Sequence, residues 1–234
     1  MPDPLTIAAV QPPCVEYDVG QNAHAHAVAI HSAGARVVVF PELSLTGYEL
    51  DAPALALDDA RLEPLVEASK ETGALALAGA PVRGEDGDEH IAMLAVDNGQ
   101  AGVAYRKMWL GDAEAERFAP GEQPVVVEVD GWRLGLAICK DTGVAEHAAA
   151  TAALGIDAYV AGVLEHADDA HVAEERALRV VADHRVWVAI ASFAGSTGGG
   201  YGAAAGGSAI WSPDGVRVSN AAVEPGAVAR ATLV

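Results

Sequence analysis

The sequence predicts an α/β fold in which a mixed β-sheet is covered by helices. The chain has 234 residues, of which 51% are hydrophobic and 20% charged, and this is enough apolar material for one sizeable core. Short apolar runs alternate with alanine-rich amphipathic stretches, as strands alternate with helices. Turn sequences join some neighbouring runs directly, so we expect hairpins and not an all-parallel sheet. Because no long linker interrupts the pattern, we expect residues 1–234 to form a single domain.

The first half of the chain is expected to begin with a strand, after which helices and strands alternate. In the second helix, Leu62, Leu65 and Val66 have helical spacing, and Gly73 follows as a C-terminal cap. In order, we expect a strand at Leu5–Val10, a helix at Gln21–Ala33, a strand at Arg36–Phe40, a helix at Asp58–Glu71, and strands at Ala74–Val82 and Ile91–Val96.

The second half is expected to contain a hairpin, two strand–helix units and a β-rich tail. The turn Asp130-Gly131 predicts the hairpin, and two Pro- and Gly-containing turns, 213–215 and 224–226, divide the tail from Gly206 onward into three strands. Before the tail we expect strands at Val125–Val129 and Arg133–Ile138, a helix at Val144–Leu154, a strand at Ala158–Val163, a helix at Asp168–Asp183 and a strand at Val186–Ala191.

The charge and cysteine content exclude several classes of function. The 14 basic and 33 acidic residues give a formal net charge of −19, which repels nucleic-acid phosphates and anionic lipids. We therefore expect no nucleic-acid partner and no membrane association. The two cysteines, Cys14 and Cys139, lie far apart and fit a reducing compartment, and Cys14 is expected to have a packing role. The first residues lack the basic and apolar regions of a signal peptide, so a cytoplasmic location is expected.

Glu42 is the first candidate for a chemical role. It directly follows the apolar run 37–40 and Pro41, so its carboxylate is expected to be partly desolvated. Desolvation raises the pKa of a carboxylate and makes it a better general base. The alternative is a helix-capping or solvated loop glutamate.

Lys107 is the second candidate, because it is one of only three lysines and lies among aromatic and apolar residues. A fixed ammonium in such a setting stabilises a developing oxyanion. The alternative is a surface lysine next to a turn.

Cys139 is the third candidate, since it ends an apolar strand just before a turn that leads into a helix. Backbone N–H groups and a helix N-terminus at this place are expected to favour the thiolate, the form that acts as a nucleophile. The alternative is a buried structural cysteine. Taken together, a base, an oxyanion stabiliser and a nucleophile are the groups required for acyl transfer through a thioester.

Several motifs, in order and spacing, resemble those of the nitrilase superfamily of carbon–nitrogen hydrolases. The similarity runs from about Leu5 to the last strand. It is carried by Phe40-Pro41-Glu42-Leu43, Thr46-Gly47-Tyr48, Tyr105-Arg106-Lys107, Phe118-Ala119-Pro120-Gly121 and Gly135-Leu136-Ala137-Ile138-Cys139-Lys140-Asp141, with Gly207-Ser208-Ala209-Ile210 and Ser212-Pro213-Asp214-Gly215 near the end.

The resemblance implies an α-β-β-α sandwich that stacks as a homodimer or a larger homo-oligomer. It also implies a Glu-Lys-Cys triad without metal or organic cofactor, in which Glu42 is the base, Lys107 the oxyanion-stabilising cation and Cys139 the nucleophile. The backbone N–H of Lys140 would be a second oxyanion donor. Family members often need a further glutamate, for which Glu114 is the first choice and Glu116 the alternative.

Two departures from the family pattern concern the substrate. Trp109 stands where the family often has histidine, and Lys140 stands where it usually has an aromatic residue. We expect both, together with Tyr48, to lie near the substrate. The Lys140 side chain either attracts a substrate carboxylate or points to solvent and pairs with an acid.

The resemblance therefore predicts a hydrolase for a small amide, an ω-amide or an N-carbamoyl compound, releasing ammonia or an amine. Two alternatives remain open: a non-catalytic binding or regulatory protein on the same scaffold, and an amide acyltransferase. Other chemistries are disfavoured. The glycine-rich segment 198–203 leads into a strand, where a dinucleotide-binding motif would lead into a helix. His24, His26 and His31 lack the arrangement of metal ligands, and Ser208 lacks a nucleophile-elbow sequence.

Overall fold

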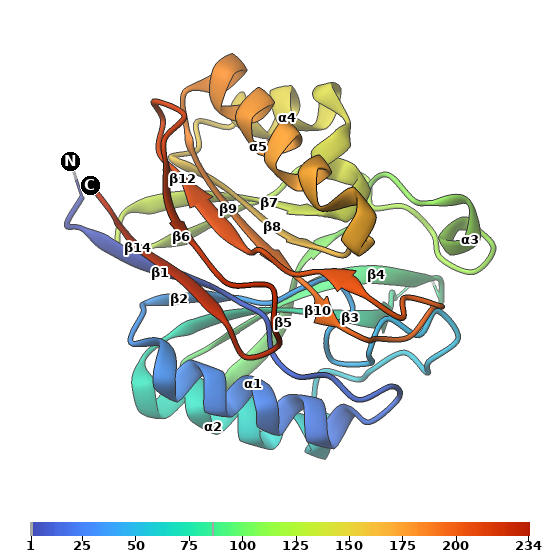
Figure 1. Cartoon of the computed structure of the whole chain (residues 1–234). Helices are drawn as coiled ribbons and strands as arrows, with labels where there is room; N and C mark the ends of the chain where they lie inside the picture. The colour runs from blue at the N-terminus through green and yellow to red at the C-terminus, as the bar shows by residue number, and fades with distance from the viewer. Residues whose placement is uncertain (1, 86) are drawn as a thin grey trace.

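Two six-stranded mixed sheets face each other in the computed structural model, which describes residues 2–85 and 87–234 (Figure 1). In the first sheet the strand order is β14-β1-β2-β3-β4-β5, and β1, β2 and β3 run parallel. In the second sheet the order is β13-β12-β9-β8-β7-β6, and β7, β8 and β9 run parallel. Each sheet thus has a parallel centre flanked by antiparallel strands.

The strands of the first sheet come from the N-terminal half and from the last segment of the chain. They are β1 (Leu5–Val10), β2 (Val37–Val39), β3 (Leu75–Arg83), β4 (Glu89–Asp97), β5 (Gln100–Arg106) and β14 (Val228–Leu233). The strands of the second sheet are β6 (Val126–Val129), β7 (Trp132–Ile138), β8 (Ala158–Val163), β9 (Trp187–Ser192), β12 (Ala209–Trp211) and β13 (Arg217–Asn220). A small separate ribbon is formed by β10 (Ala194–Gly195) and β11 (Ala204–Ala205).

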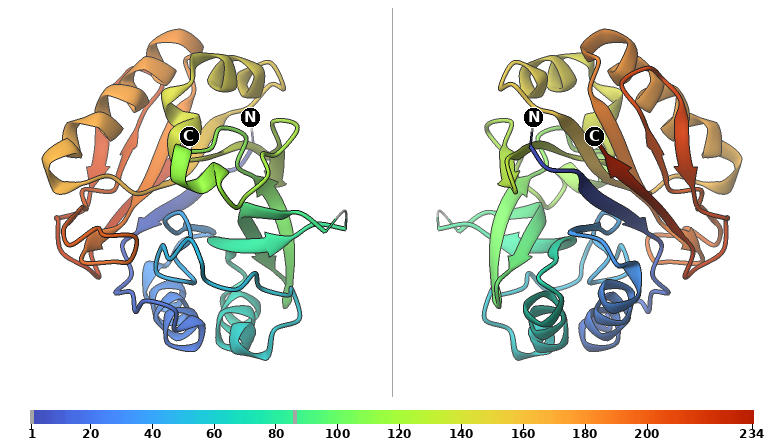
Figure 2. Two further views of the ribbon diagram at one scale, coloured as in Figure 1. Left: turned by 90° about the vertical axis from the view of Figure 1, so that its right-hand side faces the viewer. Right: turned by 90° about the vertical axis from the view of Figure 1, so that its left-hand side faces the viewer.

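Helices cover the outer face of each sheet, as the side views in Figure 2 also show. The first sheet carries α1 (Val19–Ala33) and α2 (Glu63–Thr72), and the second carries α4 (Ala145–Ala152) and α5 (Ala170–His184). A short α3 (Asp112–Ala115) and three 3₁₀ turns, η1 (Ala60–Leu62), η2 (Cys139–Gly143) and η3 (Ala167–Asp169), complete the elements.

Three apolar layers hold the sandwich together. The first lies between the sheets and includes Leu77 and Leu136, the second lies under α1 and α2, and the third lies under α4 and α5. Burial of apolar surface is the main favourable contribution to folding, and here each sheet buries both of its faces. This explains why the central strands are continuous apolar runs such as Val37–Val39.

The α-β-β-α sandwich is therefore confirmed, and so are the predicted strands and the four longer helices, within two residues at nearly all of their ends. The exception is α2, which begins at Glu63 and not at Asp58, because residues 60–62 form the 3₁₀ turn η1. The β5 strand, the α3 helix and the β10–β11 ribbon were not predicted. None of the helices in residues 2–85 and 87–234 combines the length and the apolar character that a membrane crossing requires.

Candidate active site

The carboxyl ends of strands from both sheets bring the candidate residues together. Glu42 follows β2 in the first sheet, Lys107 follows β5 in the same sheet, and Cys139 follows β7 in the second sheet. In parallel α/β sheets, functional groups gather at these strand ends. Glu114 reaches the same place from α3, and Tyr48 reaches it from the loop after Glu42.

The segment that carries Glu42 passes between two glycines, one from each sheet. A Cβ atom on Gly79 of β3 would lie 2.2 Å from the backbone nitrogen of Leu43, and one on Gly162 of β8 would lie 2.5 Å from the carbonyl oxygen of Phe40. No side chain fits at either distance, so glycine is required at both positions. Pro41 lacks a backbone N–H to continue the strand, and the chain turns there. As a result the Glu42 carboxylate lies in the interior, with 1% of the residue exposed.

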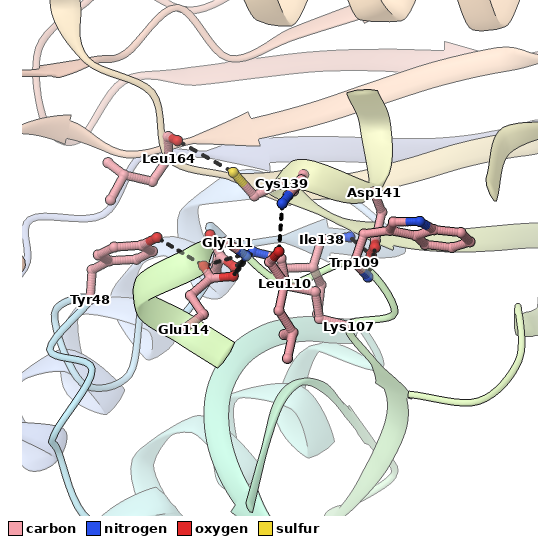
Figure 3. Close-up of polar contacts among 12 residues, drawn as sticks. Tyr48, Lys107, Trp109, Leu110, Gly111, Glu114, Ile138, Cys139, Asp141 and Leu164 are labelled. Atoms are coloured by element: carbon pink, nitrogen blue, oxygen red, sulfur yellow. Dashed lines mark hydrogen bonds and ion pairs between the residues drawn. The ribbon is translucent and has the colours of Figure 1, made fainter. Parts of the chain in front are cut away.

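Lys107 is the centre of a buried cluster of charges. Its Nζ lies 2.6 Å from Glu42 Oε1 and 2.7 Å from each carboxylate oxygen of Glu114. Glu114 also accepts hydrogen bonds from the Tyr48 hydroxyl at 3.0 Å and from the Gly111 backbone N–H at 2.7 Å (Figure 3). Lys107 is 1% exposed, so the surface-lysine alternative is wrong.

Cys139 lies at the junction of β7 and η2 with a left-handed backbone, φ 40°. A residue other than glycine adopts this conformation at an energetic cost, and such positions are concentrated at functional sites. Its sulfur donates a hydrogen bond to the carbonyl oxygen of Leu164 at 3.5 Å (Figure 3).

Burial controls the protonation of these groups. It raises the pKa of Glu42 to about 7, an effect that Lys107 partly offsets and the negative charge of Glu114 reinforces. Burial alone would lower the pKa of Lys107, but the Glu42 and Glu114 carboxylates outweigh it and hold that pKa above its usual value. The partly desolvated carboxylate predicted for Glu42 is confirmed.

The predicted preference of Cys139 for the thiolate is wrong. Burial, together with the nearby Glu42 charge, raises the pKa of the thiol. The turn after Cys139 is a 3₁₀ turn, and α4 begins only at Ala145, so the helix expected to follow the sulfur starts six residues after it. The resting thiol is therefore protonated, and a base is needed to activate it.

The structure also gives the contacts of the other predicted residues, Glu116, Lys140 and Trp109. Glu116 is exposed, whereas Glu114 is 4% exposed and contacts Lys107, so only Glu114 belongs to the cluster. Lys140 is exposed, as one alternative expected, but its Nζ donates to the carbonyl oxygen of Leu110 at 2.6 Å and not to an acid. Attraction of a substrate carboxylate by Lys140 stays a prediction. The Trp109 ring packs edge-on against His147, with ring centroids 5.5 Å apart.

Two residues near the thiol were missed. Glu165 follows Leu164 and β8, its charge helps to raise the pKa of Cys139, and it pairs with Arg176 at 2.7 Å. The rule that found Glu42 and Cys139, a polar residue after a buried strand, also applies to it. Tyr201 packs edge-on against Tyr48 with ring centroids 5.3 Å apart, and it is the single aromatic residue of the glycine-rich loop.

Known proteins resemble the chain in both sequence and fold. A curated hydrolase encoded in the 5′ region of pqqF in Pseudomonas protegens is 33% identical over 162 residues, which are 65% of this chain and 57% of that protein. An (R)-stereoselective amidase from a Pseudomonas species is 28% identical over 58% of this chain and 50% of its own length. The matches thus span about half the length of these curated relatives.

A solved structure agrees over nearly the whole chain. It is a mutant amidase from Nesterenkonia sp. AN1 with the acetamide moiety of fluoroacetamide added covalently to its active-site cysteine. It is 25% identical, with a TM-score of 0.87, and the match covers 98% of this chain and 90% of that one. Residues 6–233 match the family model described as carbon-nitrogen hydrolase. Together with the sandwich fold, this match shows that the chain belongs to the carbon–nitrogen hydrolase family, within the nitrilase superfamily.

Proposed function

We propose that the protein hydrolyses the carbon–nitrogen bond of a small amide through a thioester on Cys139. The observation that carries the proposal is the hydrogen bonding of the two carboxylate oxygens of Glu42. One of its oxygens is held by Lys107, and the other, Oε2, is buried with no hydrogen-bond partner in the part of the chain that the structure describes. A buried oxygen without a donor is costly, and here it is the atom that would accept the thiol proton.

A pKa of about 7 suits Glu42 for this task. A general base works best when its pKa lies near the working pH, because it is then ionised often enough and still holds a proton well. The thiol, whose own pKa is raised, gives up its proton only as the sulfur attacks the carbonyl carbon.

The proposed reaction has two halves, formation of a thioester and its hydrolysis. Glu42 takes the proton of Cys139, the sulfur–carbon bond forms, and the carbonyl oxygen becomes an oxyanion that Lys107 and the backbone N–H of Lys140 stabilise. The carbon–nitrogen bond breaks as Glu42 gives its proton to the leaving nitrogen. Glu42 next takes a proton from water, whose oxygen attacks the thioester. The carbon–sulfur bond breaks, and the thiol regains the proton from Glu42.

Glu114 holds Lys107 together with Glu42 in this scheme. The cation bridges two carboxylates, so its ammonium has little freedom to move. A fixed, desolvated cation stabilises a developing oxyanion without reorganisation during the reaction. Tyr48 and Gly111 in turn fix Glu114.

Ammonia release from short amides, ω-amides and N-carbamoyl compounds tests the proposal. We expect turnover of at least one neutral amide and an adduct with fluoroacetamide that peptide mass spectrometry locates on Cys139. Cys139→Ala should abolish both, because it removes the nucleophile. Cys14→Ala is the matched control and should retain both, since the Cys14 thiol donates to the Ser44 carbonyl oxygen and is not one of the groups that hydrogen-bond to Lys107.

Two outcomes would contradict the proposal. Substantial turnover by Cys139→Ala would exclude the thioester route. Failure of the protein to react with any of these compounds, with no adduct on Cys139, would favour a non-catalytic protein on the same scaffold. Added hydroxylamine separates hydrolysis from acyl transfer, because an acyltransferase would form the hydroxamate in preference to the acid.

A further inference from the structure

A chain of four buried polar side chains lies beside the reactive groups and takes no part in the proposed steps. Tyr159 comes from β8, His147 from α4, Tyr105 from β5 and Asp141 from η2. The Tyr159 hydroxyl lies 2.8 Å from His147 Nδ1, and His147 Nε2 lies 2.9 Å from the Tyr105 hydroxyl. That hydroxyl lies 2.7 Å from Asp141 Oδ2. The chain thus connects the two sheets next to the charged cluster.

The hydrogen bonds in this chain all point toward Asp141. Tyr105 donates its hydroxyl hydrogen to the carboxylate, so its oxygen accepts from His147 Nε2–H. His147 Nδ1 is then the acceptor for the Tyr159 hydroxyl. Burial lowers the pKa of His147, which agrees with a neutral ring that carries one hydrogen.

Asp141 uses this support to join the cysteine-bearing and lysine-bearing segments. Its Oδ2 accepts the backbone N–H of Ile138 at 2.9 Å, one residue before Cys139. Its Oδ1 accepts the backbone N–H of Trp109 at 2.9 Å, two residues after Lys107 (Figure 3). Tyr105, the third donor, lies two residues before Lys107. One buried carboxylate therefore binds the chain on both sides of the cation and immediately before the nucleophile.

We infer that Asp141 and His147 are positioning residues, which fix the nucleophile and the cation relative to each other through Tyr105. This inference rests on the proposed function for its kinetic test. Cys139 needs such support, because its left-handed backbone is held against its own preference. A displacement of about 1 Å between reacting groups costs about a hundredfold in rate.

His147 offers the sharpest test, because it is not itself a reactive group and reaches the Lys107 segment through Tyr105 and the Trp109 ring. His147→Leu removes the donor to Tyr105, and His147→Gln keeps an amide donor. We expect His147→Leu to lower kcat about tenfold or more with KM unchanged, and to slow alkylation of Cys139 by iodoacetamide to a similar extent. His147→Gln should recover most of both rates. His171→Leu, the same change at an exposed histidine of α5, is the control and should behave like the wild type.

The assays belong well below the melting temperature of each variant. If His147→Leu lowers only the melting temperature and keeps both rates, the residue is merely structural and the inference is wrong. If His147→Leu does not fold, Tyr159→Phe tests the same chain by removing one hydroxyl, and unchanged rates would overturn the inference. If the wild type is alkylated at Cys139 but hydrolyses no amide, the proposed function fails, while the alkylation rates still decide this inference.

Discussion

Glu114 binds Lys107 with both carboxylate oxygens, each 2.7 Å from Nζ. Glu114→Gln would replace one acceptor by an NH₂ group that faces other donors, Lys107 among them. We expect kcat/KM to fall about a hundredfold or more, because the buried Lys107 ammonium loses one of its two carboxylate partners. Glu116→Gln, two residues on and exposed, is the control and should keep wild-type kinetics. Equal loss in both variants would contradict the assignment of Glu114.

The pH dependence of kcat/KM reports the protonation of Glu42. Burial raises the pKa of this carboxyl to about 7, and the protonated form cannot accept the thiol proton. Activity should therefore be low in acid, rise about tenfold per pH unit below the pKa, and level off above about pH 7. Initial rates at low substrate from pH 5 to 9 measure this curve. An acid limb near pH 4.5, the ordinary value for glutamate, would show that Glu42 is not the desolvated base.

The charge of Glu165 is expected to select against anionic substrates. This carboxylate lies near Cys139 and Lys107, and it occupies Arg176. Glu165→Gln would remove a like charge and release Arg176, so kcat/KM for an ω-amide that carries a carboxylate should rise roughly tenfold relative to a neutral amide. Lys140→Met should leave this ratio unchanged, because Nζ already donates to Leu110. If Lys140→Met changed this ratio and Glu165→Gln did not, Lys140 and not Glu165 would control the recognition of anionic substrates.

Gly162→Ala is expected to destabilise the fold around Glu42. The new methyl group would lie 2.5 Å from the Phe40 carbonyl oxygen and 3.0 Å from the Glu42 nitrogen. Such overpacking lowers the free energy of unfolding by about 1–3 kcal/mol, which urea denaturation measures. Gly102→Ala in β5 is the control, since a Cβ there meets open space. Similar unfolding midpoints for the two variants would contradict the close approach at Gly162.

The sequence was sufficient to predict the strand ends that carry the site, because buried parallel strands are apolar runs and a polar or reactive residue is conspicuous where such a run ends. Glu42 and Cys139 stand out for this reason. The β5 strand was missed because Gln100–Arg106 is an edge strand with a mixed burial pattern, so its residues do not form an apolar run. Lys107 was nevertheless identified, because it is one of only three lysines and its neighbours in the sequence are aromatic and apolar.

Protonation at the site was harder to predict than position. Desolvation and the charge of Glu42 raise the pKa of Cys139, and Glu42 follows a strand of the opposite sheet nearly a hundred positions away in the sequence. The bonds of Asp141 to Tyr105 and Trp109 likewise join residues more than 30 positions apart. Interactions between distant segments therefore account for most of what the sequence alone did not reveal.

The raised pKa of the Cys139 thiol also affects how the protein withstands oxidants. Peroxide attacks thiolates far faster than thiols, so a sulfur that stays neutral at rest is spared from conversion to sulfenic acid. In the proposed mechanism, Glu42 takes the proton of this thiol only as the sulfur attacks a bound substrate. The same burial that slows the free thiol thus preserves it between turnovers.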